Sequence, residues 1–275
     1  MARYVSGNES EIAFLKAFNE FCYSRSSWQV WSDLITAIAC SISNAIDKIH
    51  FEKREQEYME CMERLGSVEK AAEVFNAIIM ALENNPDQDF LGHMYMALDM
   101  GNHWRGQFFT PYHISKYMAK MTINDDINTE IENKGYISIN DCCCGGGAML
   151  IGAANVLKEQ NINFQQKALF VAQDIDRVVA LMCYIQLSLL GCPGYVCVGN
   201  SLTNPITGHL LFPNENKNEG QELWYTPMFC TDVWHYRKLS LKLKGIFESE
   251  KQLKKENFTF FFDFEKGEYR HERIV

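Results

Sequence analysis

One short segment of the chain combines an acid, three thiols and three glycines. Residues 141–147 read Asp-Cys-Cys-Cys-Gly-Gly-Gly and lie between a β-rich segment and a stretch of helical composition. Consecutive glycines let a backbone turn sharply and approach a ligand closely. The helix that follows offers free N–H groups and the positive end of its dipole at this turn. A glycine cluster alone is as often a tight turn as a binding loop, so its surroundings decide between the two interpretations.

A second acid follows at the end of the next predicted strand. Asp174 stands in residues 173–176, Gln-Asp-Ile-Asp. A carboxylate at this place can accept hydrogen bonds from both ribose hydroxyls of an adenosine. The alternative is a solvated acid at a strand end, which is common in α/β proteins. The order strand, glycine loop, helix, strand, acid favours nucleoside binding over that alternative.

The elements that must position these residues alternate between strand and helix. Strands are predicted over residues 136–140, 168–173 and 195–198, and helices over residues 146–160 and 177–190. This alternation predicts a parallel sheet joined by crossover helices.

A further helix is predicted just before this sheet. It starts at Thr110 and Pro111, with the threonine as its cap and the proline at the first helical position. Its apolar residues recur at helical spacing and are predicted to face the core. These residues are Ile114, Tyr117, Met118 and Met121.

The remaining chain predicts a helical beginning and a β-rich end. Residues 1–100 carry apolar residues at helical spacing, so we expect a helical domain there and a cofactor-binding domain over residues 101–275. Residues 212–221 are polar and predict a loop. Residues 258–264 and 269–274 flank Glu-Lys-Gly-Glu and predict a hairpin.

Composition limits the class of protein. Apolar residues make up 47% of the chain, which is normal for a globular protein. No apolar run reaches membrane-spanning length, and residues 1–5 lack the apolar core of a signal peptide. The ten cysteines form no Cys-x-x-Cys pair, and the seven histidines lack ligand spacing. We therefore expect a cytoplasmic protein with free thiols, no membrane segment and no metal.

The charge balance bears on nucleic-acid binding. The formal net charge of the 275 residues is −9, whereas a protein that grips a DNA backbone alone usually presents a basic surface. This balance argues against strong DNA binding by the chain alone. It permits a DNA-acting subunit that gains its affinity from a partner.

Four motifs in order resemble one family. Residues 106–111, Gly-Gln-Phe-Phe-Thr-Pro, are similar to the segment before the cofactor domain in adenine-specific DNA methyltransferases of the type I restriction-modification modification-subunit family. The family's next motif is Asp-Pro-x-Cys-Gly-Ser-Gly, and residues 141–147 match it except at the Pro and the Ser. Its element Gly-Asp-(Ser/Thr)-Leu appears as residues 199–202, Gly-Asn-Ser-Leu. Residues 89–92, Asp-Phe-Leu-Gly, also fit, and the resemblance extends over residues 85–205.

This resemblance implies S-adenosylmethionine as cofactor and a methyltransferase-type, Rossmann-like α/β sandwich behind an N-terminal helical domain. In the family, the first segment packs over the methionine end of the cofactor, and the acid after the second strand matches Asp174. Asn200 stands where the family has an Asp that accepts the adenine amine, and its carbonyl oxygen can still accept. The residues expected to bind the cofactor are Phe109, Thr110, Pro111, Asp141, Cys144, Gly145, Gly147, Asp174, Ile175, Asn200 and Ser201.

The family's catalytic motif is missing. That motif is Asn-Pro-Pro-(Phe/Tyr) after the fourth strand; its Asn and a backbone carbonyl hold the adenine amine, and its aromatic ring stacks on the flipped base. No Asn-Pro-Pro occurs in this chain. The best-placed candidates are Thr226, Pro227 and Phe229, which follow the strand-like residues 222–225. The alternative is that these residues form only a structural turn.

Residues 231–238, Thr-Asp-Val-Trp-His-Tyr-Arg-Lys, combine aromatic and basic side chains. Such a segment could stack on bases and pair with phosphates, but it is more often a helix with a buried aromatic face. We favour the helix.

Three functions from different classes follow. The first is S-adenosylmethionine-dependent adenine-N6 methylation of DNA, with DNA bound weakly or through a specificity-type partner subunit in a homo- or hetero-oligomer. The second is a catalytically inactive, cofactor-binding homologue that acts as a regulatory or assembly subunit. The third, a nicotinamide-dependent oxidoreductase, shares the glycine loop and the acid but has no reason to carry residues 106–111.

Overall fold

The structure is a computed structural model. It divides into two compact units, Met1–Thr231 and Asp232–Val275, which are described separately. In the part of the chain that the structure describes, no helix is long and apolar enough to cross a membrane. The described residues are 8–23, 25–100, 109–123, 126–216, 220–256, 258–263 and 268–273.

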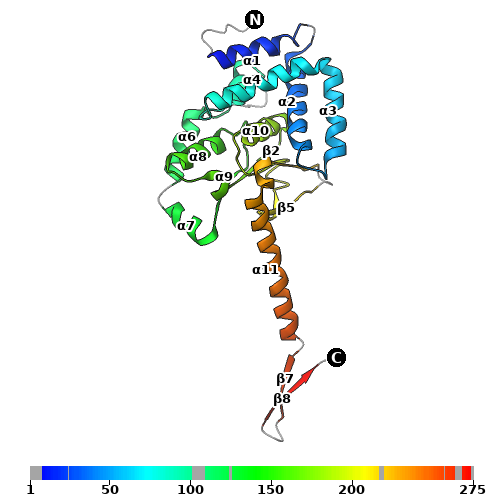
Figure 1. The fold of residues 1–275 in the computed structure, drawn as a ribbon, viewed down its shortest axis with the longest axis vertical. Helices are drawn as coiled ribbons and strands as arrows, with labels where there is room; N and C mark the ends of the chain where they lie inside the picture. The colour runs from blue at the N-terminus through cyan, green and yellow to red at the C-terminus, as the bar shows by residue number, and fades with distance from the viewer. Residues whose placement is uncertain are drawn as a thin grey trace. The chain divides into compact units, whose positions relative to one another are not determined.

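The first unit begins with helices. Their pairing joins α2 to α3 and α1 to α4 (Figure 1). The turn between α3 and α4 uses Gly66, whose φ of 79° lies in the left-handed region that favours glycine. The helices are α1 (Glu9–Asn19), α2 (Ser27–Asn44), α3 (Phe51–Leu65), α4 (Val68–Asn84) and α5 (Phe90–Ala97).

A four-stranded sheet follows, in the order β1-β2-β3-β6. β1, β2 and β3 are parallel, and α8 (Ala148–Glu159) and α10 (Arg177–Leu189) lie in the connections between them. The predicted parallel sheet with crossover helices is therefore confirmed. β6 differs because it runs antiparallel to β3. The strands are β1 (Ile137–Asp141), β2 (Ala168–Asp174), β3 (Gly194–Val198) and β6 (Glu222–Tyr225).

Shorter elements fill the connections. β4 (Thr207–His209) and β5 (Phe212–Asn214) pair as a small antiparallel hairpin, so the prediction of a loop over residues 212–221 is wrong at its start. The others are α7 (Asp126–Lys134), α9 (Phe164–Lys167) and the 3-10 helix η3 (Pro227–Cys230).

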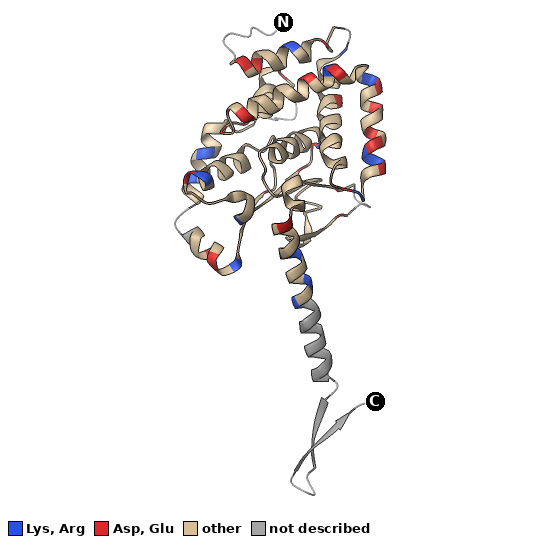
Figure 2. Ribbon diagram, viewed as in Figure 1, with Lys and Arg blue, Asp and Glu red and all other residues tan. Residues whose placement is uncertain are grey.

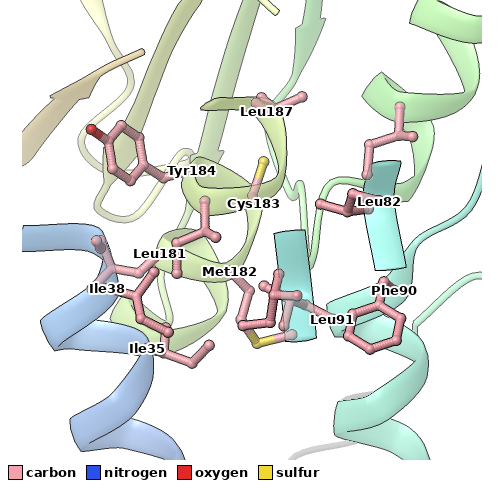
Figure 3. Packing of buried hydrophobic residues seen from close by; sticks show 14 of the residues in the cluster. Ile35, Ile38, Leu82, Phe90, Leu91, Leu181, Met182, Cys183, Tyr184 and Leu187 are labelled. Atoms are coloured by element: carbon pink, nitrogen blue, oxygen red, sulfur yellow. The ribbon is translucent and has the colours of Figure 1, made fainter. Parts of the chain in front are cut away.

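The core of the first unit is centred on α10. This helix contacts β2 and β3 and also packs against α2, α4 and α5. Figure 3 shows Leu181, Met182 and Cys183 of α10 among residues of these helices, including Ile35 of α2 and Phe90 of α5. The initial helices and the sheet thus share one continuous core, and the boundary predicted near residue 100 lies inside this unit.

The helix before the sheet, α6 (Tyr112–Thr122), faces the core with its small residues. Ser115 and Ala119 are buried, and a Cβ added to Gly152 of α8 would lie 3.1 Å from the backbone of Lys116. The two backbones therefore approach closely, and the larger side chains turn outward. The prediction that the apolar residues of this helix face the core is wrong. The exposed residues are Ile114, Tyr117, Met118 and Met121.

The second unit consists of a helix and a hairpin. α11 (Asp232–Glu256) includes most of residues 231–238, so the predicted helix is confirmed, and the Arg237 guanidinium lies 4.6 Å from the centre of the Trp234 ring. β7 (Phe258–Asp263) and β8 (Glu268–Arg273) pair antiparallel, which confirms the predicted hairpin over its described residues.

A buried arginine joins the helices of the first unit to its sheet. The Arg54 guanidinium donates to Asp47 Oδ2 at 2.7 Å and to the Leu223 carbonyl at 2.6 Å. It lies 3.8 Å from the centre of the Trp224 ring and is only 3% exposed. Removing one partner of a buried ion pair by mutation leaves the other charge buried and uncompensated.

We predict that Arg54→Ala lowers the free energy of unfolding by about 3–5 kcal/mol, because the buried Asp47 carboxylate then loses its guanidinium partner and keeps only His50 beside it. Lys53→Ala serves as the control, since the Lys53 side chain is 63% exposed in its pair with Glu222 and should cost under about 1 kcal/mol. Urea denaturation measures both. Equal losses in the two variants would contradict this role for Arg54.

Candidate functional site

The loop between β1 and α8 is folded back on itself. The Cys144 N–H donates to the Gln173 carbonyl at 3.0 Å, and the Gly147 N–H donates to the Cys144 carbonyl at 2.8 Å. Gly145 and Gly147 have φ values of 54° and 97°, which glycine adopts at low cost. A Cβ at Gly147 would also lie 3.0 Å from the Cys183 sulfur. Gly147 is thus required both for the turn and for close packing on α10.

Cys144 is buried beneath this loop. A hydrogen bond with Cys183, together with burial, raises the pKa of the Cys144 thiol. A thiol held in its protonated form is a poor nucleophile. Cys144 therefore packs the loop, and its side chain has no catalytic character in this geometry.

Asp174 lies at the end of β2, directly beside the loop. Its Oδ2 accepts the Gly145 N–H at 2.9 Å, and its Oδ1 accepts the Asp176 N–H at 2.9 Å. Burial raises the pKa of Asp174, and these amide hydrogen bonds oppose the rise. Each carboxylate oxygen has two lone pairs, so Asp174 keeps acceptor capacity for a ligand. The neighbouring Ile175 side chain is exposed.

Asp141 ends β1 next to Asp174. Its Oδ1 accepts the Cys143 N–H at 3.1 Å. Burial raises the pKa of Asp141, and the negative charge of Asp174 raises it further. The two carboxylates are therefore close enough to repel each other, and a positively charged ligand would relieve that repulsion.

Phe109 covers the loop from the segment before α6. Its ring stacks on Tyr95 of α5 with 5.1 Å between centroids and an interplanar angle of 19°. A Cβ added to Gly145 would lie 3.4 Å from the Phe109 ring. Phe109 thus lies over Gly145 and beside the glycine loop.

The start of α6, which follows Phe109, differs from the predicted helix start at Thr110 and Pro111. Residues 106–108 of the predicted motif lie outside the described residues. Thr110 and Pro111 are exposed, and Pro111 takes the cap position of α6, so the helix begins one residue later than predicted. The proline ring, which has no N–H to donate, is tolerated there.

The loop after β3 completes the site. The Gly199 N–H donates to the Asp174 carbonyl at 2.8 Å, and the Ser201 hydroxyl lies 4.0 Å from the Cys143 sulfur. Asn200 Oδ1 accepts the N–H groups of Leu202 and Thr203, so the acceptor that was expected to bind the adenine amine is already used in this loop. The structure therefore brings Asn200 and Ser201 to the same edge of the sheet as Asp141 and Asp174, because the carboxyl ends of parallel strands meet there.

The candidate catalytic segment lies elsewhere. Thr226 is fully buried, and its hydroxyl donates to the Cys192 carbonyl at 2.7 Å and accepts the Gly194 N–H at 2.9 Å. Gly194 starts β3, whereas the cofactor candidates follow the ends of the parallel strands. Because β6 is antiparallel to β3, it delivers Thr226 to the opposite end of the sheet.

Pro227 and Phe229 belong to η3 at that same end. The Phe229 ring is buried and packs against Tyr195 and Tyr225. The contacts of Thr226, Pro227 and Phe229 support the structural turn, and the catalytic interpretation of these three residues is corrected accordingly.

Two buried glutamines that bond to the loops of the site were not predicted from the sequence. Gln186 on α10 bonds to the loop at the Gly146 carbonyl, and Gln173 on β2 bonds to the Asn204 carbonyl and the Ile206 N–H. Both are glutamines within apolar runs, and an uncharged polar residue in such a run is the signal that could have found them.

Comparison with known proteins places the chain in a family. The model of the family described as N-6 DNA methylase matches residues 86–262, and the chain belongs to that family. No curated protein matches it. A Listeria monocytogenes structure assigned to the class I S-adenosylmethionine-dependent methyltransferases is similar with a TM-score of 0.38 and 13% identity. That match covers 92% of this chain and 81% of the other.

We predict that Thr226→Val destabilises the protein by about 1–3 kcal/mol, because the buried Gly194 N–H loses its acceptor. The affinity for S-adenosylmethionine should stay within about twofold of wild type, since Thr226 lies away from the loop. Thermal unfolding and calorimetric titration measure the two effects. A large loss of affinity with unchanged stability would restore a role for Thr226 in the site.

Proposed function

We propose that the chain binds S-adenosylmethionine at the carboxyl ends of β1, β2 and β3 and takes part in adenine-N6 methylation of DNA as one subunit of an assembly. The observation that carries the proposal is the bond between Asp174 and the Gly145 N–H. It holds a ribose-binding carboxylate against a glycine loop at the start of a helix. Membership of the N-6 DNA methylase family supports the same function.

The residues present fit this cofactor. Asp174 offers acceptors to the two ribose hydroxyls. Asn200 lies on the neighbouring loop, where its Oδ1 is already used by the Leu202 and Thr203 N–H groups, so we assign it no bond to the adenine amine. The Phe109 ring lies in van der Waals contact over Gly145 and forms one wall beside the glycine loop, where we place the methionine end. When bound, the cofactor supplies an electrophilic methyl group on a positively charged sulfur.

Two observations bear on the choice between this ligand and a dinucleotide. Burial raises the pKa of Asp141, and the nearby negative charge of Asp174 adds a smaller rise. A cationic sulfonium and amino group would relieve the repulsion between these two carboxylates, whereas a pyrophosphate would add two negative charges to it. The ribose-binding role of Asp174 is common to both ligands, and the match to the N-6 DNA methylase family over residues 86–262 favours the methyltransferase.

A partner is proposed for two reasons. The net charge is −9, and Figure 2 shows acidic and basic residues interspersed along α3, so the chain offers little electrostatic attraction to a DNA backbone. The side chain that would hold the target amine is not supplied by Thr226, which is engaged at the other end of the sheet. We propose that DNA affinity and the amine contact depend on another subunit.

We predict that Asp174→Ala weakens binding of S-adenosylmethionine by about 1–3 kcal/mol, the scale of lost charge-assisted hydrogen bonds. Asp174→Asn should lose less, because it keeps one acceptor for the Gly145 N–H. Glu83→Ala on the exposed surface of α4 is the control and should bind as wild type. Calorimetry that detects no binding by the folded wild-type chain would falsify the proposed function.

Methyl transfer by the isolated chain should be very slow, although the cofactor binds. Losing one preorganised polar contact from a transition state typically costs about 100- to 1,000-fold in rate. The assay is transfer of labelled methyl groups to adenine-rich duplex DNA by wild type, Thr226→Ala and Thr226→Asn. We expect near-background transfer in all three; rapid wild-type transfer would show that the chain carries its own amine contact.

The same observation supports a second candidate, a cofactor-binding subunit that regulates or assembles a methylase without catalysis. Thr226 is used structurally, and the motif it was expected to replace is absent. Background transfer even in the presence of a DNA-binding methylase subunit that forms a complex with the chain would favour this second candidate.

A further inference from the structure

A buried acid and a buried amide, Asp89 and Gln186, lie against the glycine loop at Gly146. Asp89 caps α5, and its Oδ1 accepts the Gly92 N–H at 2.9 Å. Its carboxyl is buried, and this burial raises the pKa of Asp89. Gln186, on α10, is fully buried beside it. Buried polar groups of this kind persist only where their hydrogen bonds are satisfied.

The amide of Gln186 connects three segments of the chain. Its Nε2 donates to Asp89 Oδ1 at 2.7 Å and to the Gly146 carbonyl at 2.8 Å. Its Oε1 accepts the Leu91 N–H at 3.0 Å. Both hydrogens of this NH₂ group are therefore used. One goes to the cap of α5 and the other to the middle glycine of the loop.

Steric contact reinforces these bonds. A Cβ added to Gly146 would lie 3.2 Å from Asp89 Oδ1 and 3.3 Å from the Gly92 Cα. The loop thus rests directly on the first turn of α5. The same helix supplies Tyr95, which supports Phe109 over Gly145, so α5 contacts the loop region from two positions.

We propose that Asp89 and Gln186 are positioning residues that hold the glycine loop in its cofactor-binding conformation and couple α5 to that loop. The inference rests on the proposed function for its ligand. Neither side chain is assigned a contact with the cofactor. They act by fixing the Gly146 peptide, and such coupling is reciprocal: a ligand that binds the fixed loop must also stabilise α5.

The test uses the full chain and four variants. Gln186→Met keeps the length of the side chain and removes its hydrogen bonds. Asp89→Asn keeps the Oδ1 acceptor and is a good cap, so it is the conservative rescue of Asp89→Ala. Leu34→Ala, in the buried face of α2, is the matched control for lost stability without a change at the loop.

Three quantities are measured: amide exchange of residues 142–150 in the unliganded protein, the Kd for S-adenosylhomocysteine, and the protection of Phe90–Ala97 that this ligand induces. In Gln186→Met and Asp89→Ala we expect loop exchange to rise and Kd to weaken by about 10-fold or more, the effect of an unsatisfied buried group. The induced protection of α5 should be lost. Asp89→Asn should stay within about threefold of wild type.

The control separates positioning from general stability. Leu34→Ala should lower the Tm with little change in loop exchange or Kd. If Gln186→Met behaves like Leu34→Ala, the positioning role is wrong. If the wild-type chain does not bind S-adenosylhomocysteine, the proposed function fails, while loop exchange in the unliganded variants still decides whether Asp89 and Gln186 hold the loop.

Discussion

Three consecutive glycines form the constraint on which the site depends, and they are held by β2 and α10. Gly145 donates its N–H to Asp174 at the end of β2. The Gly146 carbonyl accepts from Gln186 on α10. Gly147 packs against the Cys183 sulfur. A side chain at any of the three would meet a neighbouring ring, carboxyl or sulfur, so the loop conformation and the packing of α10 require each other.

This constraint explains why the helical start of the chain belongs to the site. α10 bonds to the loop through Gln186 and also packs against the helices α2, α4 and α5, and Figure 3 shows side chains of these helices in one core. The initial helices are therefore part of the structure that shapes the loop. Arg54 extends the same connection to the last strand of the sheet through the Leu223 carbonyl.

The sequence predicted the parts of the fold that depend on local pattern. The glycines of residues 141–147 predicted the loop between a strand and a helix. The alternation of strands and helices predicted that Asp174 ends the next strand. The outward orientation of the large apolar residues of α6 did not follow from the sequence, because it is set by the close approach of the α6 backbone to Gly152 of α8. The helical period identifies an apolar face, but it does not reveal that small residues can pack more closely against a neighbouring helix.

The direction of β6 in the sheet was the second feature that the sequence did not predict. Residues 222–225 read as a strand, but pairing direction is a tertiary property, and antiparallel pairing with β3 moves Thr226 to the opposite end of the sheet. Gln186 was hidden for a related reason, since its partners lie 95, 97 and 40 positions away in sequence. Its place in an apolar run marks it as a polar residue that needs buried partners, but a single sequence does not say which residues those partners are.

We propose that the glycine loop of residues 141–147, Asp174 and Phe109 form one S-adenosylmethionine site. A crystal structure of the chain with S-adenosylhomocysteine tests it most directly. We predict ligand density at the carboxyl ends of β1 to β3, with the ribose hydroxyls on Asp174 and the homocysteine end beside the glycine loop and the Phe109 ring. Density at another surface, with the glycine loop uncontacted, would contradict it.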